Sequence, residues 1–120
     1  SPMNIQHFEK GLHYSALAIS AIARKLGKLA TYCKKVKDES SVIRIESERR
    51  DTKKDRDQVM VAVTVELPHK VLRAESLKRQ VLEAVDRCMD KLEPQLIKYK
   101  EMHIGKAKAR IRKGTKPWAN

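Results

Sequence analysis

The feature of this chain that most restricts its fold is a run of strict alternation between residues 58 and 67. Every second side chain there is aliphatic: Val59, Val61, Val63, Val65 and Leu67. Because successive side chains of a β-strand point to opposite faces, these residues share one face of a strand. The other face carries a mixture of polar and apolar residues: Met60, Ala62, Thr64 and Glu66. The alternation therefore predicts a sheet with one buried face and one face in water.

Further segments fit the same sheet. We expect strands at Asn4–Phe8, Ser41–Glu48 and Lys70–Glu75. Their inward side chains should include Ile43, Ile45, Leu72 and Ala74. The charged stretch Arg49–Asp57 fits a hairpin connection, and Pro68 with His69 fits a turn.

Two segments have helical periodicity. Ser15 is a suitable N-cap for the first, whose apolar face consists of Ile19, Ile22, Leu26, Leu29 and Cys33. The second should run from Leu77 to Met102, with an apolar seam of Val81, Val85, Cys88, Leu92, Leu96 and Tyr99. Pro94 lies inside this helix and cannot donate to the Asp90 carbonyl, so we expect a kink near Asp90–Pro94 and not an end.

The element order β-α-β-β-β-α predicts an α+β fold with a four-stranded mixed sheet and both helices packed on one face. A right-handed crossover through the first helix would make the first two strands parallel, and hairpins would make the others antiparallel. The length of 120 residues suits one domain. We place it at residues 3–103, with a basic flexible tail at residues 104–120 and a remnant of an expression tag at residues 1–2.

The formal net charge of +12 predicts a polyanionic partner, most often nucleic acid. Residues 10–37 hold seven basic groups and residues 103–120 hold six, with no acid in either stretch. Helical geometry places Arg24, Lys28 and Lys35 opposite the first apolar face. It also places Arg87, Lys91 and Lys98 on one flank of the last helix. The other side of that helix holds Glu83, Asp86, Asp90 and Glu93. We therefore expect an RNA-facing surface made by the first helix and one flank of the last, to which the tail adds Lys108 and Arg110.

The sequence contains none of the motifs that would indicate an enzyme. The sequence has no G-x-x-x-x-G-K-[ST], G-x-G-x-x-G or H-E-x-x-H pattern. The histidines are scattered, and Cys33 and Cys88 fall on apolar faces, where buried thiols are the expected outcome. No enzyme activity, metal or cofactor is therefore expected. No apolar run approaches a membrane span, so the expected location is the cytoplasm.

Several blocks of the sequence together resemble the ribosome hibernation promoting factors, a family that includes the ribosome-associated translation inhibitor. The blocks are MNIQHF at residues 3–8, ARKLGKLATY at residues 23–32 and VLEAVDRCMDKLEPQLIKYKEMH at residues 81–103. The segment VTVELPHKVLRAES at residues 63–76 fits the region before the last helix of that family. The resemblance covers residues 3–103.

The resemblance implies a factor that binds the small ribosomal subunit, contacts ribosomal RNA and occupies the decoding channel, inhibiting translation in stress or stationary phase. We expect the protein itself to be a monomer. It also implies a fold similar to a double-stranded-RNA-binding domain with an extra first strand. The lysines that match the basic positions of the family are Lys25, Lys28, Lys91, Lys98 and Lys100. Arg24, Lys35 and Arg87 are added from helical geometry alone.

The chain departs from the family pattern at two positions. Leu82 stands where a tyrosine is usual, and Pro94 stands where a basic residue is common. Two alternatives to ribosome binding stay open. One is a protein-interaction module that regulates transcription, in the manner of a sigma-factor modulator; the other is a general binder of double-stranded RNA.

Overall fold

The computed structural model describes residues 3–50 and 58–105, with side chains as far as His103. Its elements are β1 (Ile5–Lys10), α1 (Ala16–Gly27), α2 (Leu29–Tyr32), the 3₁₀ turn η1 (Lys34–Lys37), β2 (Val42–Arg49), β3 (Val59–Leu67), β4 (Lys70–Lys78), α3 (Val81–Tyr99) and the π-helical turn η2 (Lys100–Gly105). Three segments lie outside the described residues: the expected tag remnant (residues 1–2), the middle of the expected hairpin connection (51–57) and residues 106–120 of the expected tail.

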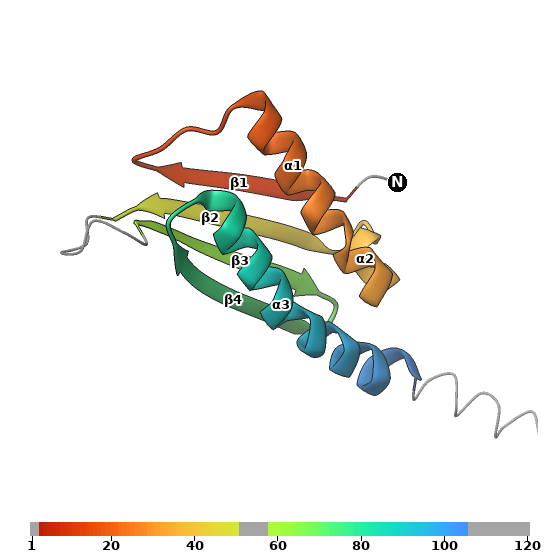
Figure 1. Ribbon diagram of the computed structural model, residues 1–120. Coiled ribbons are helices and arrows are strands. Elements are labelled where there is room, and N and C mark those ends of the chain that lie inside the picture. Colours follow the sequence, from red (N-terminus) through yellow and green to blue (C-terminus); the bar gives the residue numbers. More distant parts are fainter. Residues whose placement is uncertain (1–2, 51–57, 106–120) are drawn as a thin grey trace, which may run out of the picture.

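The four strands form one mixed sheet in the order β1-β2-β3-β4. β1 runs parallel to β2, whereas β2–β3 and β3–β4 are antiparallel. Figure 1 shows α1 and α3 lying across the same face of this sheet. The predicted α+β class, strand order and two-helix layer are confirmed.

The core lies between the helices and the inner face of the sheet. The five alternating side chains of β3 are all buried, as predicted, and they meet Ile22, Leu26, Leu29, Leu92 and Leu96 from the helices. Cys33 and Cys88 are free and buried, as expected. One predicted core residue is wrong, because Ile19 is 41% exposed. It lies at the border of the apolar stripe in the first turn of α1, beyond the part of the helix that Ile22 and Leu26 anchor.

The single helix expected to extend from Ser15 to Cys33 is divided. Lys28 N–H donates to the Lys25 carbonyl at 3.1 Å, a tighter i→i−3 bond that separates α1 from α2. A further turn, η1, then follows and buries Val36 completely. The sequence did not predict η1, which brings three lysines into one short turn.

The boundary between β4 and α3 also differs from the prediction. Leu77, expected to begin the last helix, instead pairs with Met60 in the β3–β4 ladder. β4 continues to Lys78 and α3 begins at Val81, because cross-strand pairing outweighs the helical preference of this segment. At its other end α3 continues past Pro94 to Tyr99, so the proline does not end the helix.

The N-terminus of α1 provides a test of the local folding rules. The Ser15 hydroxyl accepts a hydrogen bond from the Ala18 N–H at 3.0 Å. Ser15→Ala is expected to lower the free energy of unfolding by about 1 kcal/mol, since one amide loses its partner. Urea denaturation measures this change. Ser20→Ala, an exposed change inside the same helix, should have almost no effect; equal losses from both variants would contradict the capping role.

Candidate nucleic-acid interface

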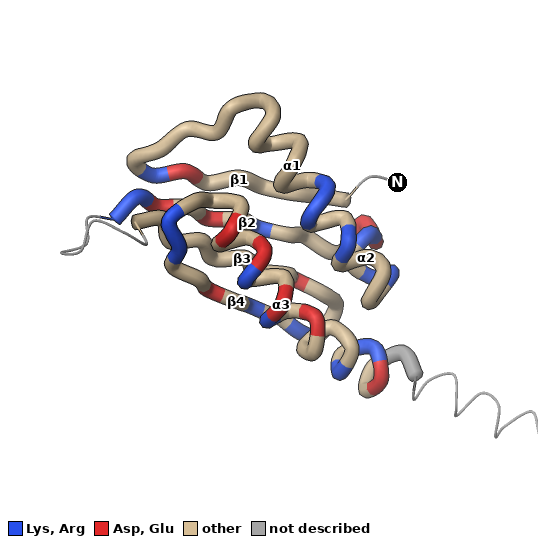
Figure 2. Tube along the Cα trace, viewed as in Figure 1, with Lys and Arg blue, Asp and Glu red and all other residues tan. Residues whose placement is uncertain are grey.

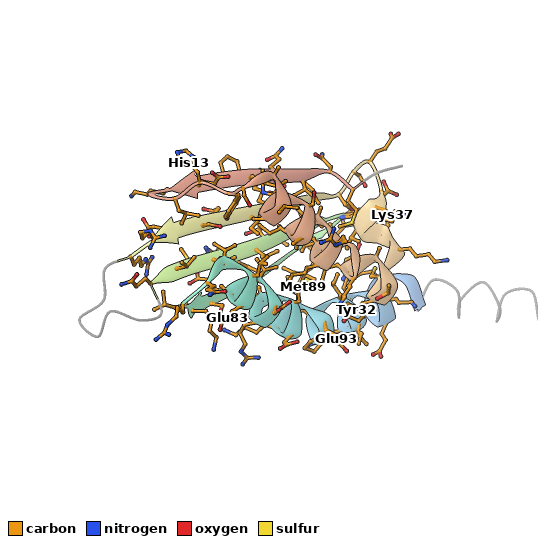
Figure 3. The ribbon with its side chains drawn as sticks, turned by 45° about the horizontal axis from the view of Figure 1, so that its top comes forward. His13, Tyr32, Lys37, Glu83, Met89 and Glu93 are labelled. Atoms are coloured by element: carbon orange, nitrogen blue, oxygen red, sulfur yellow. The ribbon has the colours of Figure 1, made fainter. Side chains whose placement is uncertain are left out.

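Helix α3 has an acidic flank that faces α1 and α2. We call Asp86, Asp90 and Glu93 the acidic row. Lys25 Nζ of α1 lies 2.7 Å from Asp86 Oδ1. Burial raises the pKa of Tyr32 in α2, and the Glu93 charge, a hydrogen bond to Glu93 and the Asp90 charge raise it further. Figure 3 shows Tyr32 and Glu93 close together. The acidic row therefore borders the seam between the helices.

Lys25 is consequently engaged within the protein. Its side chain is only 27% exposed, while its partner Asp86 is 58% exposed. The pair joins α1 to α3, and the carboxylate offsets much of the field that the ammonium would present to an approaching phosphate. Lys25 was predicted to contact RNA, and the structure places it as a link between helices.

Arg24 and Lys28 are placed differently. Together with Ala21, Lys25 and Leu82, they line a groove of about 460 Å³ on the outer side of the helices. Neither Arg24 nor Lys28 has a side-chain partner among the described residues. These two predicted site residues present their charge to solvent from a rigid helix.

The basic flank of α3 lies on the opposite side, above the β4 edge. Lys91 Nζ donates to the Glu75 carbonyl at 2.6 Å, and Gln95 Nε2 donates to the Arg73 carbonyl at 3.3 Å. These bonds satisfy outward-facing carbonyls of an edge strand, which are otherwise open to pairing with another chain. Lys91 was predicted to contact RNA, yet its ammonium already covers the sheet edge.

Two other predicted cations of this flank, Arg87 and Lys98, remain without a side-chain partner in the described part of the chain. Lys100, the first residue of η2, also has no side-chain partner there, but helical geometry places it on the side of Glu93. Arg87 and Lys98 are separated from Arg24 and Lys28 by the acidic row. Figure 2 shows that α3 carries charges of both signs whereas α1 carries only Lys and Arg. The structure thus divides the expected two-helix surface into two basic patches with the acidic row between them.

The turn η1 adds cations that the sequence did not single out. Lys35, a predicted site residue, forms an ion pair with Asp38 at 3.1 Å. Hydrogen bonds from the Ser40 amide and hydroxyl, together with Lys35, lower the pKa of Asp38 to about 2, so this carboxylate stays charged beside Lys35. Lys34 and Lys37 have no partner among the described residues. The acid-free stretch at residues 10–37 was the signal that pointed to them.

The open face of the sheet has a different electrostatic character. Six of its charges form three ion pairs: Lys10 with Glu48 at 3.3 Å, Arg44 with Glu66 at 3.0 Å, and Arg73 with Glu75. Paired charges present little net field to a polyanion. The unpaired cations of the described residues therefore favour the helical side as the nucleic-acid interface.

Other kinds of site receive little support. Burial raises the pKa of the Cys88 thiol to about 11, which makes it a poor nucleophile. In residues 3–50 and 58–105 the structure has no cluster of three or more His, Cys, Asp or Glu side chains suited to a metal ion. None of the described helices combines the length and apolarity of a membrane span. The predicted site residues Lys108 and Arg110 lie outside the described residues.

Comparisons with known proteins bear on the family and the fold. Residues 10–103 match the family model described as sigma 54 modulation protein / S30EA ribosomal protein. A ribosomal subunit interface protein from Coxiella burnetii is 30% identical, with a TM-score of 0.64 over 82% of this chain and 98% of that one.

The N-terminal domain of protein Y from Thermus thermophilus is 22% identical, with a TM-score of 0.64 over 81% of this chain and 99% of that one, and it supports the fold. No curated protein matches the sequence significantly.

Proposed function

This chain belongs to the sigma 54 modulation protein / S30EA ribosomal protein family, a family of ribosome-associated factors, and from that premise we propose that it binds the small ribosomal subunit through ribosomal RNA. The observation that carries the proposal is the set of unpaired cations on the helical side: Arg24, Lys28, Lys34 and Lys37. These four residues lie within residues 24–37 of the chain. None of them takes part in the ion pairs of the open sheet face.

The physical basis is recognition of the RNA backbone. Folded RNA is read mostly through its shape, its phosphates and its 2′-hydroxyl groups. Cations held on helices release counterions from the RNA and lose little conformational freedom when they bind. On the α3 side we expect Arg87, Lys98 and Lys100 to provide secondary contacts, and Lys108 and Arg110 to add to them from the tail.

In the cell, we propose that the bound protein occupies the decoding channel and inhibits translation as a hibernation factor during stress or stationary phase. It would act in the cytoplasm as a monomer. A rigid body with cations on one side suits a channel lined by ribosomal RNA, because it can exclude other RNA ligands by volume as well as by charge.

Co-sedimentation with purified ribosomal subunits tests the proposal. The protein should pellet with small subunits at physiological salt, and higher salt should release it steeply. Transfer RNA bound at the decoding site should compete with it. Failure to pellet with small subunits would overturn the proposal.

A second candidate function is regulation of a transcription factor through protein contact. The family description names sigma 54 modulation, and the open sheet face exposes Phe8 (51%) and Val71 (60%). Capture of a partner that survives nuclease and high salt would favour this function. A general binder of double-stranded RNA would instead bind any long duplex as tightly as small subunits.

A further inference from the structure

Two hollows meet at the end of the molecule where α3 stops. The larger one, about 740 Å³, is lined by Lys34, Lys37, His69, Tyr99 and His103, among others. The smaller one, about 400 Å³, is lined by Lys70, Lys98, Met102, Tyr99 and His103, among others. Tyr99 and His103 belong to both, so this aromatic pair forms the ridge between the two hollows.

The ridge has one fixed ring and one exposed ring. The rings of Tyr99 and His103 are stacked, with centroids 4.6 Å apart and an interplanar angle of 29°. Tyr99 is only 5% exposed, and its hydroxyl donates to the Pro68 carbonyl at 3.0 Å, which fixes its ring. His103 is exposed. One face of its imidazole therefore rests on Tyr99, and the other is accessible.

Lysines without a partner among the described residues stand on both sides of this ridge. Lys34 and Lys37 line the larger hollow, and Lys70 and Lys98 line the smaller one. Figure 3 shows the Lys37 side chain projecting from the body of the molecule. The nearby Lys35 is occupied by Asp38. The ridge is thus flanked by ammonium groups available to anions.

The turn beside the larger hollow carries a conformational strain. His69 has a φ of +65°, in the left-handed region that glycine and asparagine adopt more readily. Its side chain lines the larger hollow. Histidine is among the residues enriched in this region, and a tight turn such as the one between β3 and β4 often requires it.

We infer that this end of the protein binds unpaired RNA, with one base stacked on His103 and the flanking phosphates held by the lysines of the two hollows. The inference rests on the proposed function and names the RNA that this part of the surface would take. A hollow on each side of the ridge suits a strand that crosses it, whereas a mononucleotide would fill only one. A duplex keeps its bases stacked inside and offers none to the imidazole.

The experiment compares two probes by fluorescence anisotropy. One is an unstructured RNA of about eight nucleotides, within the site size of single-strand binders, and the other is an abasic ribose-phosphate chain with the same charge. His103→Ala should weaken binding of the RNA about five- to tenfold, since one stacked base is lost. The same variant should leave binding of the abasic chain unchanged, and His103→Phe should restore the preference for bases.

The lysines should contribute equally to the binding of the two probes. Lys34→Ala with Lys37→Ala should weaken both probes equally and reduce the slope of log affinity against log salt by about 1.4. The matched control is Lys78→Ala with Arg79→Ala, which removes the same charge at the far end of β4 and should have a much smaller effect.

Two results would overturn the inference. One is an equal effect of His103→Ala on both probes, and the other is binding by the Lys34/Lys37 variant that matches the control. If either result is obtained while the unmodified protein binds small subunits, this site alone is rejected. If the unmodified protein does not bind small subunits, the proposed function itself is rejected.

Discussion

Reversing the charge of Arg24 and Lys28 together is expected to weaken binding to the small ribosomal subunit roughly a hundredfold. Both side chains lack a partner among the described residues and line the outer groove of α1. Each substitution by glutamate removes an attraction to RNA phosphates and adds a repulsion. Neither residue belongs to the core, so the thermal midpoint should stay close to that of the unmodified protein.

Quantitative co-sedimentation measures this effect. Lys10→Glu with Arg73→Glu is the matched control, because it changes the net charge by the same amount on the open sheet face. Its lost ion pairs lie at the surface, and solvent screens the repulsion from Glu48 and Glu75 that replaces them, so the loss of stability should be small. The control should weaken binding far less. Equal weakening by the two double variants would mean that overall charge, and not the α1 groove, attracts the ribosome.

The choice of Arg24 and Lys28 illustrates what the sequence could and could not predict. Lys25 and Lys28 match the family pattern equally well, and both lie off the apolar face. Only the fold brings Asp86, 61 residues away in the chain, to 2.7 Å from Lys25. Lys25→Glu would place two carboxylates together and disturb the contact between helices. Helical geometry predicts the direction of a side chain but not the neighbour it will meet.

The strands were more predictable than the boundaries of the helices. In β3 the period of two fixes which side chains enter the core, and a shift of one residue would turn that entire face to solvent. The division after Gly27 and the turn η1 depend on single hydrogen bonds and on the burial of Val36, which no periodicity encodes. The start of α3 was missed for a related reason, because pairing between Leu77 and Met60 decides it.

Pro94→Ala is expected to raise the free energy of unfolding by about 2–3 kcal/mol, because proline in a helix interior costs about 3 kcal/mol relative to alanine. Pro94 is exposed, and the helix continues beyond it through the buried residues Leu96 and Tyr99. Alanine restores the amide that can donate to the Asp90 carbonyl. Calorimetry should show a thermal midpoint higher by about 10 °C.

Lys98→Ala, an exposed change one turn later, should leave the midpoint nearly unchanged. A fall in stability for Pro94→Ala would mean that packing of Leu96 and Tyr99 requires the bend predicted at Asp90–Pro94. Pro94→Arg then separates shape from charge, because arginine shares the helical preference of alanine and adds a cation where the family commonly has one. Tighter ribosome binding by Pro94→Arg than by Pro94→Ala would show that this position faces RNA. If the two variants bind equally, any gain in ribosome binding over the unmodified protein comes from removing the proline.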